Sequence, residues 1–193
     1  MKLIDKRYEE IKEIATKLLM KYNISCVPIN GFEIASKMGI EIRPYTQKGY
    51  GLFFKASEDG FTMFMEDKTI IYYNPCQIYR RMNNTIVHEI GHIVLGHLQE
   101  SELAEAEVNF FAKYLLAPPV LIHKLQLHSA NEIENIFEIS HQAAQIAWDY
   151  YNKWLSNSGK FYKPYEIKLI NLFQNNIGEH LHSNEQNAIK KAL

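Results

Sequence analysis

The sequence predicts an α+β fold that is mostly helical, with a small antiparallel sheet of about three strands. Three observations lead to this prediction. Apolar residues recur at helical spacing near the N-terminus and again from about residue 77 onward. Between these regions, residues 40–73 hold short β-like runs separated by turn sequences. The chain has 193 residues, of which 47% are hydrophobic, enough to bury the core of one compact domain.

Two helices are expected before the sheet. In the first, over residues 5–22, the apolar side chains share one helical face and Asp5 can cap the start. These apolar positions are Tyr8, Ile11, Ala15, Leu18, Leu19 and Tyr22. A second, short helix is expected over residues 31–38, ending at Gly39.

The sheet is expected at about residues 40–73. Its β-like runs are IEIRPY, GLFFKA, FTMFM and TIIYY. The sequences SEDG and EDK are typical of hairpin turns, so the last three runs are expected to pair antiparallel. The sequence NPC at 74–76 marks the end of the sheet.

The rest of the chain is expected to be helical. The sequence APP at 117–119 ends one of these helices, because proline cannot continue it. The expected helices cover about 78–95, 102–116, 119–126, 131–137 and 140–156. The sequence SNSG at 156–159 is the best linker candidate. We therefore expect one domain over 1–156 and a helical C-terminal tail over 157–193.

Composition excludes several classes of protein. The net charge is −1, so no overall field attracts nucleic acid or an anionic membrane. No apolar run approaches membrane-spanning length, and the charged N-terminus does not resemble a signal peptide. The two cysteines, Cys26 and Cys76, form no C-x-x-C motif, which favours a reducing cytoplasm over a disulfide framework.

The motif His88-Glu89-Ile90-Gly91-His92 lies within the helix expected over 78–95. At about 100° per residue, His88 and His92 lie about 40° apart and one turn along, so their imidazoles can bind one metal ion. Glu89 lies about 100° round the helix, where it can act as a general base on a water at that ion. The alternative is that both histidines are partly buried polar residues of an ordinary helix, since this short motif also occurs by chance.

A zinc site that does chemistry needs a third protein ligand. In the helix expected over 102–116, Glu107 is the only charged residue inside a broad apolar arc. A carboxylate buried alone is costly, and such groups are normally paired or bound to metal. We therefore expect Glu107 to be the third ligand. Two alternatives remain: Glu107 is neutral or pairs with Arg80 or Arg81, or the helix has another register and Glu105 is the ligand.

These residues resemble the ImmA/IrrE family of zinc-dependent metallopeptidases. Members show H-E-hydrophobic-G-H followed by E-A-N-x-F-A-x-x-L-L-x-P. The second motif corresponds here to EVNFFAKYLLAP at 107–118, in which Val108 stands for the usual alanine and Ala117 precedes the proline. The resemblance extends upstream to the N-terminal helix and downstream to about residue 155. There, residues at about 131–156 resemble a helix-turn-helix segment.

The resemblance implies a zincin-like metallopeptidase domain with an HEXXH active-site helix. His88, His92 and Glu107 would hold one Zn²⁺ per chain, and Glu89 would be the catalytic base. The implied function is a zinc endopeptidase that cleaves a specific protein, such as a helix-turn-helix repressor in mobile-element or stress control. The alternative is a non-catalytic, metal-containing regulator that binds a repressor or DNA.

Other residues carry weaker expectations. Direct nucleic-acid binding is not expected, because acidic residues outnumber the single lysine in 129–158. His97 is expected to cap the helix or to support the metal ligands, and Asn109 to support a neighbouring loop or histidine. The substrate is expected to pair with the edge of FTMFM or TIIYY. Candidates for the donor to the oxyanion are Tyr114, His97, His141 and Arg81.

Overall fold

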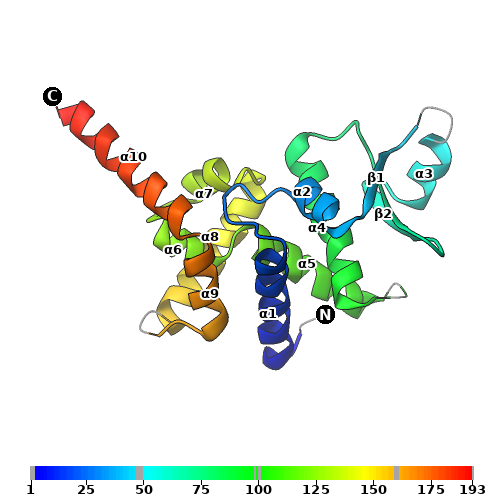
Figure 1. The fold of residues 1–193 in the computed structure, drawn as a ribbon, viewed down its shortest axis with the longest axis horizontal. Coiled ribbons are helices and arrows are strands. Elements are labelled where there is room, and N and C mark those ends of the chain that lie inside the picture. Colours follow the sequence, from blue (N-terminus) through cyan, green and yellow to red (C-terminus); the bar gives the residue numbers. More distant parts are fainter. Residues whose placement is uncertain (1–2, 47–49, 98, 100, 159–160, 193) are drawn as a thin grey trace. The chain divides into compact units, whose positions relative to one another are not determined.

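The computed structural model describes residues 3–46, 50–97, 99, 101–158 and 161–192. Helices make up most of this part of the chain, and three short strands form one sheet, so the predicted α+β class is confirmed. The elements shown in Figure 1 are α1 (Asp5–Lys21), α2 (Gly31–Met38), β1 (Glu41–Pro44), α3 (Tyr50–Ala56), β2 (Gly60–Phe64), β3 (Thr69–Tyr73), α4 (Tyr79–Leu95), α5 (Glu102–Leu116), α6 (Pro119–Lys124), α7 (Ala130–Phe137), α8 (His141–Ser158), α9 (Pro164–Leu172) and α10 (Gln174–Ala192).

The chain divides into two compact units. The first comprises residues 1–15 and 30–112, and the second comprises residues 16–29 and 113–193. The boundaries fall inside α1 and α5, so each of these helices contributes its N-terminal part to the first unit and its C-terminal part to the second. The sheet, α2, α3 and α4 all belong to the first unit.

The sheet has the strand order β1-β3-β2, with β3 in the middle. β2 and β3 pair antiparallel, with Thr62 opposite Ile71, which confirms the hairpin predicted at EDK. β1 pairs parallel with β3, with Ile42 opposite Ile71, so the prediction of a wholly antiparallel sheet is wrong for this strand. The chain crosses over from β1 through α3 and β2, and this long connection permits the parallel pairing.

The segment GLFFKA forms most of α3, and the prediction of a β-like run there is wrong. The Phe53 ring packs on the rings of Tyr45 and Tyr72, with centroids 5.4 and 5.0 Å away. Leu52 and Phe54, on either side, are 74% and 43% exposed. A short apolar run fits a strand or a helix equally well, and here the packing of one phenylalanine on the sheet accompanies the helical form.

The predicted helices are present, and their ends have local causes. Asn30 caps α2, because its side chain accepts hydrogen bonds from the backbone N–H groups of Phe32 and Glu33. Gly39 and Gly96 end α2 and α4 with φ of 75° and 74°, a left-handed conformation that glycine adopts without strain. None of the described helices has the length and apolar character needed to cross a membrane.

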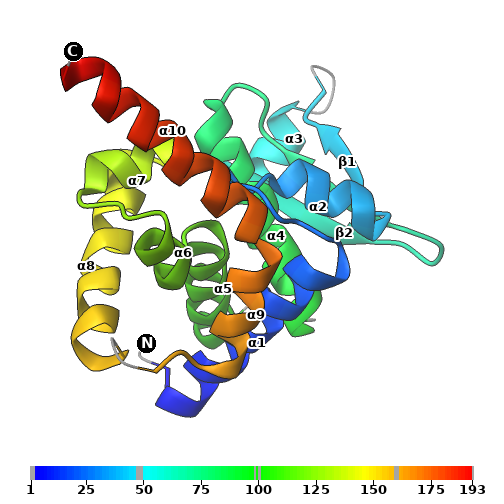
Figure 2. The same ribbon diagram turned by 60° about the vertical axis from the view of Figure 1, so that its left-hand side comes forward.

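α4 packs on β2 and β3, and α5 approaches it at Gly91. Figure 2 shows the same elements from a second direction. A Cβ atom on Gly91 would lie 2.9 Å from Phe111 Cδ1 and 3.0 Å from Val108 Cγ1, so this glycine lets α5 approach. A Cβ atom on Gly60 of β2 would lie 2.5 Å from Thr85 Cγ2 on α4. These two close approaches bring α5 and β2 beside the helix that carries the H-E-x-x-H motif.

The second unit is helical. α7 packs on α8, and α6 packs on α8 and α9. α8 runs to Ser158, so the expected linker at 156–159 begins inside a helix, and residues 159 and 160 lie outside the described part of the chain. The segment 157–193 contains α9 and α10, and α9 buries Tyr165 and Leu169.

Candidate metal centre

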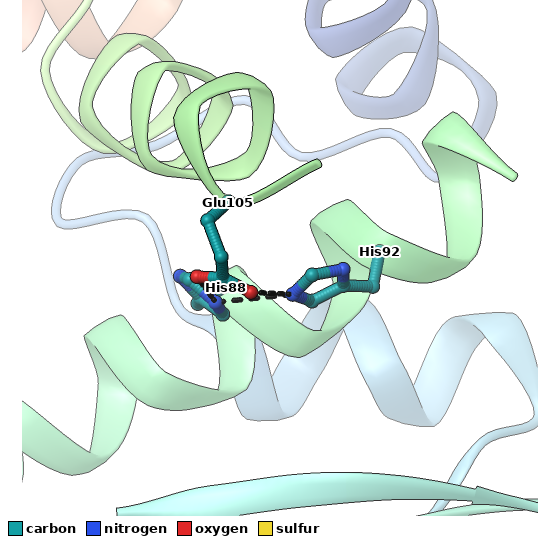
Figure 3. A group of neighbouring side chains, drawn as sticks. All are labelled: His88, His92 and Glu105. Carbon is teal, nitrogen blue, oxygen red and sulfur yellow. Dashed lines mark hydrogen bonds and ion pairs between the residues drawn. The ribbon is translucent and has the colours of Figure 1, made fainter. Parts of the chain in front are cut away.

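His88 and His92 lie one turn apart on α4, and their imidazoles point toward each other (Figure 3). The Nε2 atoms of the two rings are 3.2 Å apart. Only 21% of the His88 side chain and 16% of the His92 side chain are exposed. The two histidines therefore present their Nε2 atoms to a common, largely shielded point.

Glu105 of α5 brings a carboxylate to the same point (Figure 3). Its Oε2 lies 3.4 Å from Nε2 of His88, and its Oε1 lies 3.2 Å from Nε2 of His92. In a tetrahedral zinc site with bonds of about 2.0–2.2 Å, neighbouring ligand atoms lie roughly 3.3–3.6 Å apart. The donor types and their spacing thus fit a zinc ion bound by two imidazoles and one carboxylate.

Glu107, which the sequence favours as third ligand, lies elsewhere. Its side chain is buried, as its place in the apolar arc predicts, but Arg7 of α1 binds it through two hydrogen bonds of 2.7 and 2.5 Å. Its Oε2 also lies 3.0 Å from Nε2 of His97. Among the described residues, the group that could hold a metal contains Glu105 instead. The burial of Glu107 thus has another explanation, because a partner a hundred residues away satisfies the carboxylate, and local periodicity cannot reveal that partner.

Glu89, the expected catalytic base, is also buried, with 8% of its surface exposed. The hydroxyl of Thr62 on β2 donates a hydrogen bond of 2.7 Å to Glu89 Oε2. Because Thr62 belongs to the strand beside α4, the sheet itself holds this carboxylate in place. Thr62 was not predicted from the sequence, where nothing distinguishes it from any other threonine of a strand.

A cleft of about 400 Å³ connects these groups. His88, Glu89, His92 and Glu105 line it, so the expected base and the three possible ligands share one cavity. Gly60, Phe61, Thr62 and Phe64 of β2 form part of its wall. Within the described residues, β2 pairs with β3 alone, so its other edge has no strand beside it.

The charges in and around the cleft suit metal binding. Burial, above all, lowers the pKa of the His88 imidazole, an effect that neighbouring His92 strengthens and Glu105 opposes. A lowered pKa keeps the ring neutral, and only a neutral imidazole offers its lone pair to a metal. At Glu107, by contrast, the charged form is favoured, because its hydrogen bonds with Arg7 lower the pKa of its carboxyl group.

Comparison with known families decides the class of this site. The sequence matches the IrrE N-terminal-like domain, a peptidase family, over residues 35–158. The chain belongs to this family. The matched residues run from α2 to the end of α8 and include all four groups of the cleft, and no curated protein matches the sequence. The resemblance drawn from the two motifs is thus confirmed, and the class is metallopeptidase, which implies a bound metal and a protein substrate.

The other residues that the sequence suggests as oxyanion donors or supporting residues of this IrrE-like chain lie in different parts of the structure. Arg81 pairs with Asp59 through hydrogen bonds of 2.7 and 3.0 Å. His141 belongs to the second unit, where Glu134 lies 2.9 Å from its Nδ1. Asn109 is exposed on α5. Of the four residues considered as oxyanion donors, His97 is the one that lines the cleft.

Proposed function

We propose that this chain is a zinc-dependent endopeptidase that cleaves a specific protein. One observation carries the proposal: the Nε2 atoms of His88 and His92 and the carboxylate of Glu105 have tetrahedral spacing in the cleft that Glu89 also lines. His88, His92 and Glu105 would hold one zinc ion per chain. Glu105 takes the place that the sequence assigns to Glu107, two residues along the same helix.

The residues around the ion account for peptide hydrolysis. When bound, zinc supplies Lewis acidity, which polarises the scissile carbonyl and lowers the pKa of the attacking water. Glu89 accepts the proton of that water and returns it to the leaving amine. The hydrogen bond from Thr62 fixes one oxygen of Glu89, so the carboxylate keeps its direction during both transfers.

The wall of the cleft suits an extended peptide. The edge of β2 can pair with a substrate strand through backbone hydrogen bonds, and a strand so bound would run past Glu89 and the histidines. Phe64 lines the cleft and is 55% exposed, which offers apolar contact to a substrate side chain. The motif resemblance favours a helix-turn-helix repressor as the substrate.

The test combines metal analysis with cleavage. The purified chain should contain about one zinc per molecule and should cut a helix-turn-helix repressor encoded beside its gene into discrete fragments. Changing Glu89→Gln should leave zinc content intact and stop cleavage, because the base is removed and the ligands are kept. A protein that binds no zinc after loading with the metal would refute the proposal.

A non-catalytic regulator is the second candidate, and the same variant separates the two functions. A regulator that acts by binding should keep its biological effect after Glu89→Gln, whereas a peptidase should lose it. The position of Glu89 in the cleft favours the peptidase, because a protein that only binds needs no base beside the metal ligands.

A further inference from the structure

A series of four neighbouring side chains leads away from the candidate metal centre through the first unit: His92, His97, Glu107 and Arg7. Nδ1 of His92 lies 3.3 Å from Nδ1 of His97, and Nε2 of His97 lies 3.0 Å from Oε2 of Glu107. Arg7 then donates two hydrogen bonds to the Glu107 carboxylate, at 2.7 and 2.5 Å. The series thus links α4, the second residue after its end, α5 and α1.

The ring N–H hydrogens of the two histidines in this series can be assigned without conflict. His92 directs Nε2 toward His88 and Glu105, so a metal ligated there leaves the ring hydrogen on Nδ1. Nδ1 of His97 must then accept that hydrogen bond, which places the hydrogen of His97 on Nε2, facing Glu107. Glu107 can only accept and Arg7 can only donate, so the pattern closes without conflict.

The backbone brings His97 back to His92. Gly96 has φ of 74°, which reverses the chain after the last turn of α4. The N–H of His97 then donates to the carbonyl oxygen of His92 over 3.0 Å, so backbone and ring are both tied to the same residue. The side chains of His97 and Glu107 are only 12% and 8% exposed, so water competes little for these hydrogen bonds.

We propose that His97 and Glu107 are positioning residues for the metal ligand His92. His97 fixes the tautomer and the ring plane of His92, and Glu107, anchored by Arg7, fixes those of His97. The inference rests on the proposed zinc site. Hydrogen-bonding partners of metal-bound histidines typically change metal affinity by about 10–100-fold when they are removed. Glu107 thus supports the metal site from one step further out than a ligand would.

Zinc affinity measured by competition with a chromophoric chelator tests the proposal. His97→Leu removes the acceptor for His92 and should weaken zinc binding by about 10–100-fold. His97→Asn should recover most of this loss, since the asparagine Oδ1 stands near the lost Nδ1 and can accept the same hydrogen bond. Glu107→Gln should weaken binding less than His97→Leu does. Wild-type affinity in His97→Leu would overturn the proposal.

A second measurement uses the unaltered protein and does not depend on how the variants fold. Long-range ¹H–¹⁵N NMR of the zinc-loaded chain reports which ring nitrogen of each histidine is protonated. His92 should carry its hydrogen on Nδ1 and His97 on Nε2, a readout that a merely structural role does not fix. A hydrogen on Nδ1 of His97 would overturn the proposal.

Different results would refute the proposed zinc site and the positioning role of His97 and Glu107. If the wild-type chain binds no zinc, the proposed function and the positioning role fail together. If the wild-type chain binds zinc and Glu105→Ala abolishes binding, but His97→Leu binds like the wild type, only the positioning role fails. Thermal unfolding of the metal-free variants identifies any that do not fold, and for those the NMR result decides.

Discussion

Glu105 and Glu107 stand two residues apart on α5 and serve different partners: Glu105 Oε1 lies 3.2 Å from Nε2 of His92, whereas Glu107 Oε2 lies 2.5 Å from Arg7. Two residues on a helix are about 200° apart, so only one of these carboxylates can face the histidines of α4. The Glu107 carboxylate points into the core of the first unit, where Arg7 donates hydrogen bonds to it and Nε2 of His97 lies 3.0 Å from its Oε2. In the proposed zinc site, the same helix thereby provides a ligand, Glu105, and a positioning residue, Glu107.

Changing Glu105→Ala should abolish stoichiometric zinc binding. The loss of affinity should exceed the roughly 10–100-fold expected when a ligand's supporting partner is removed, because a ligand itself is lost. Metal analysis after dialysis against a weak chelator gives the zinc content of each variant. Glu102→Ala is the matched control, since Glu102 is exposed in the first turn of the same helix and should leave zinc content at the wild-type level. Equal zinc content in both variants would place the third ligand elsewhere.

Changing Arg7→Met should destabilise the protein by about 3 kcal/mol. It leaves the buried Glu107 carboxylate without its cation, and breaking a buried pair in this way typically costs about 3–5 kcal/mol. The lower value is expected because 28% of the Arg7 side chain is exposed. Urea unfolding of the metal-free protein measures the change.

Two further variants test that explanation. Lys6→Met removes an 83% exposed lysine from the same helix and should change stability by no more than about 0.5 kcal/mol. Adding Glu107→Gln to Arg7→Met should recover part of the loss, because a neutral amide is cheaper to bury than a carboxylate. If Arg7→Met unfolds at the same urea concentration as Lys6→Met, the ion pair contributes little.

Local sequence patterns predicted the helices and the H-E-x-x-H face well, because period and capping are properties of neighbouring residues. Gly39 and Gly96 illustrate this, since each ends its helix where the sequence places the end. Helical periodicity also predicted that Glu107 is buried. What local patterns could not supply was the partner of that carboxylate, because Arg7 lies a hundred residues away.

The sheet shows the same limit. The EDK hairpin joins neighbouring segments and was predicted, whereas the parallel pairing of β1 with β3 depends on a long connection. The hydrogen bond from Thr62 to Glu89 likewise depends on the packing of β2 against α4, and no pattern of neighbouring residues predicts that packing.

Changing Thr62→Val should slow cleavage of the substrate while leaving zinc affinity unchanged. Valine has the shape of threonine but cannot donate to Glu89, and a hydrogen bond to a charged group contributes about 1.5–3 kcal/mol, or roughly 10–100-fold in rate. Turnover and zinc affinity are measured on the same preparations. Thr62→Ser keeps the hydroxyl and should retain most of the activity. A serine variant as slow as the valine variant would show that packing, and not the hydrogen bond, matters at this position.

The free energy of unfolding should decrease as the pH falls below about 6.5, in part because of the titration of His123. Burial, and to a lesser degree neighbouring Lys124, lowers the pKa of its imidazole from the ordinary value of 6.5. Its Nδ1 lies 3.1 Å from the hydroxyl of Tyr151, inside the second unit. The unfolded chain therefore takes up a proton first as the pH drops. Stability is intact above the unfolded pKa and declines as the pH falls toward the lower folded pKa.

Urea unfolding at pH 7.5 and 5.5 should show a smaller loss of stability in His123→Gln than in the wild type, because the variant lacks this group. Equal losses in the two proteins would contradict a lowered pKa at His123.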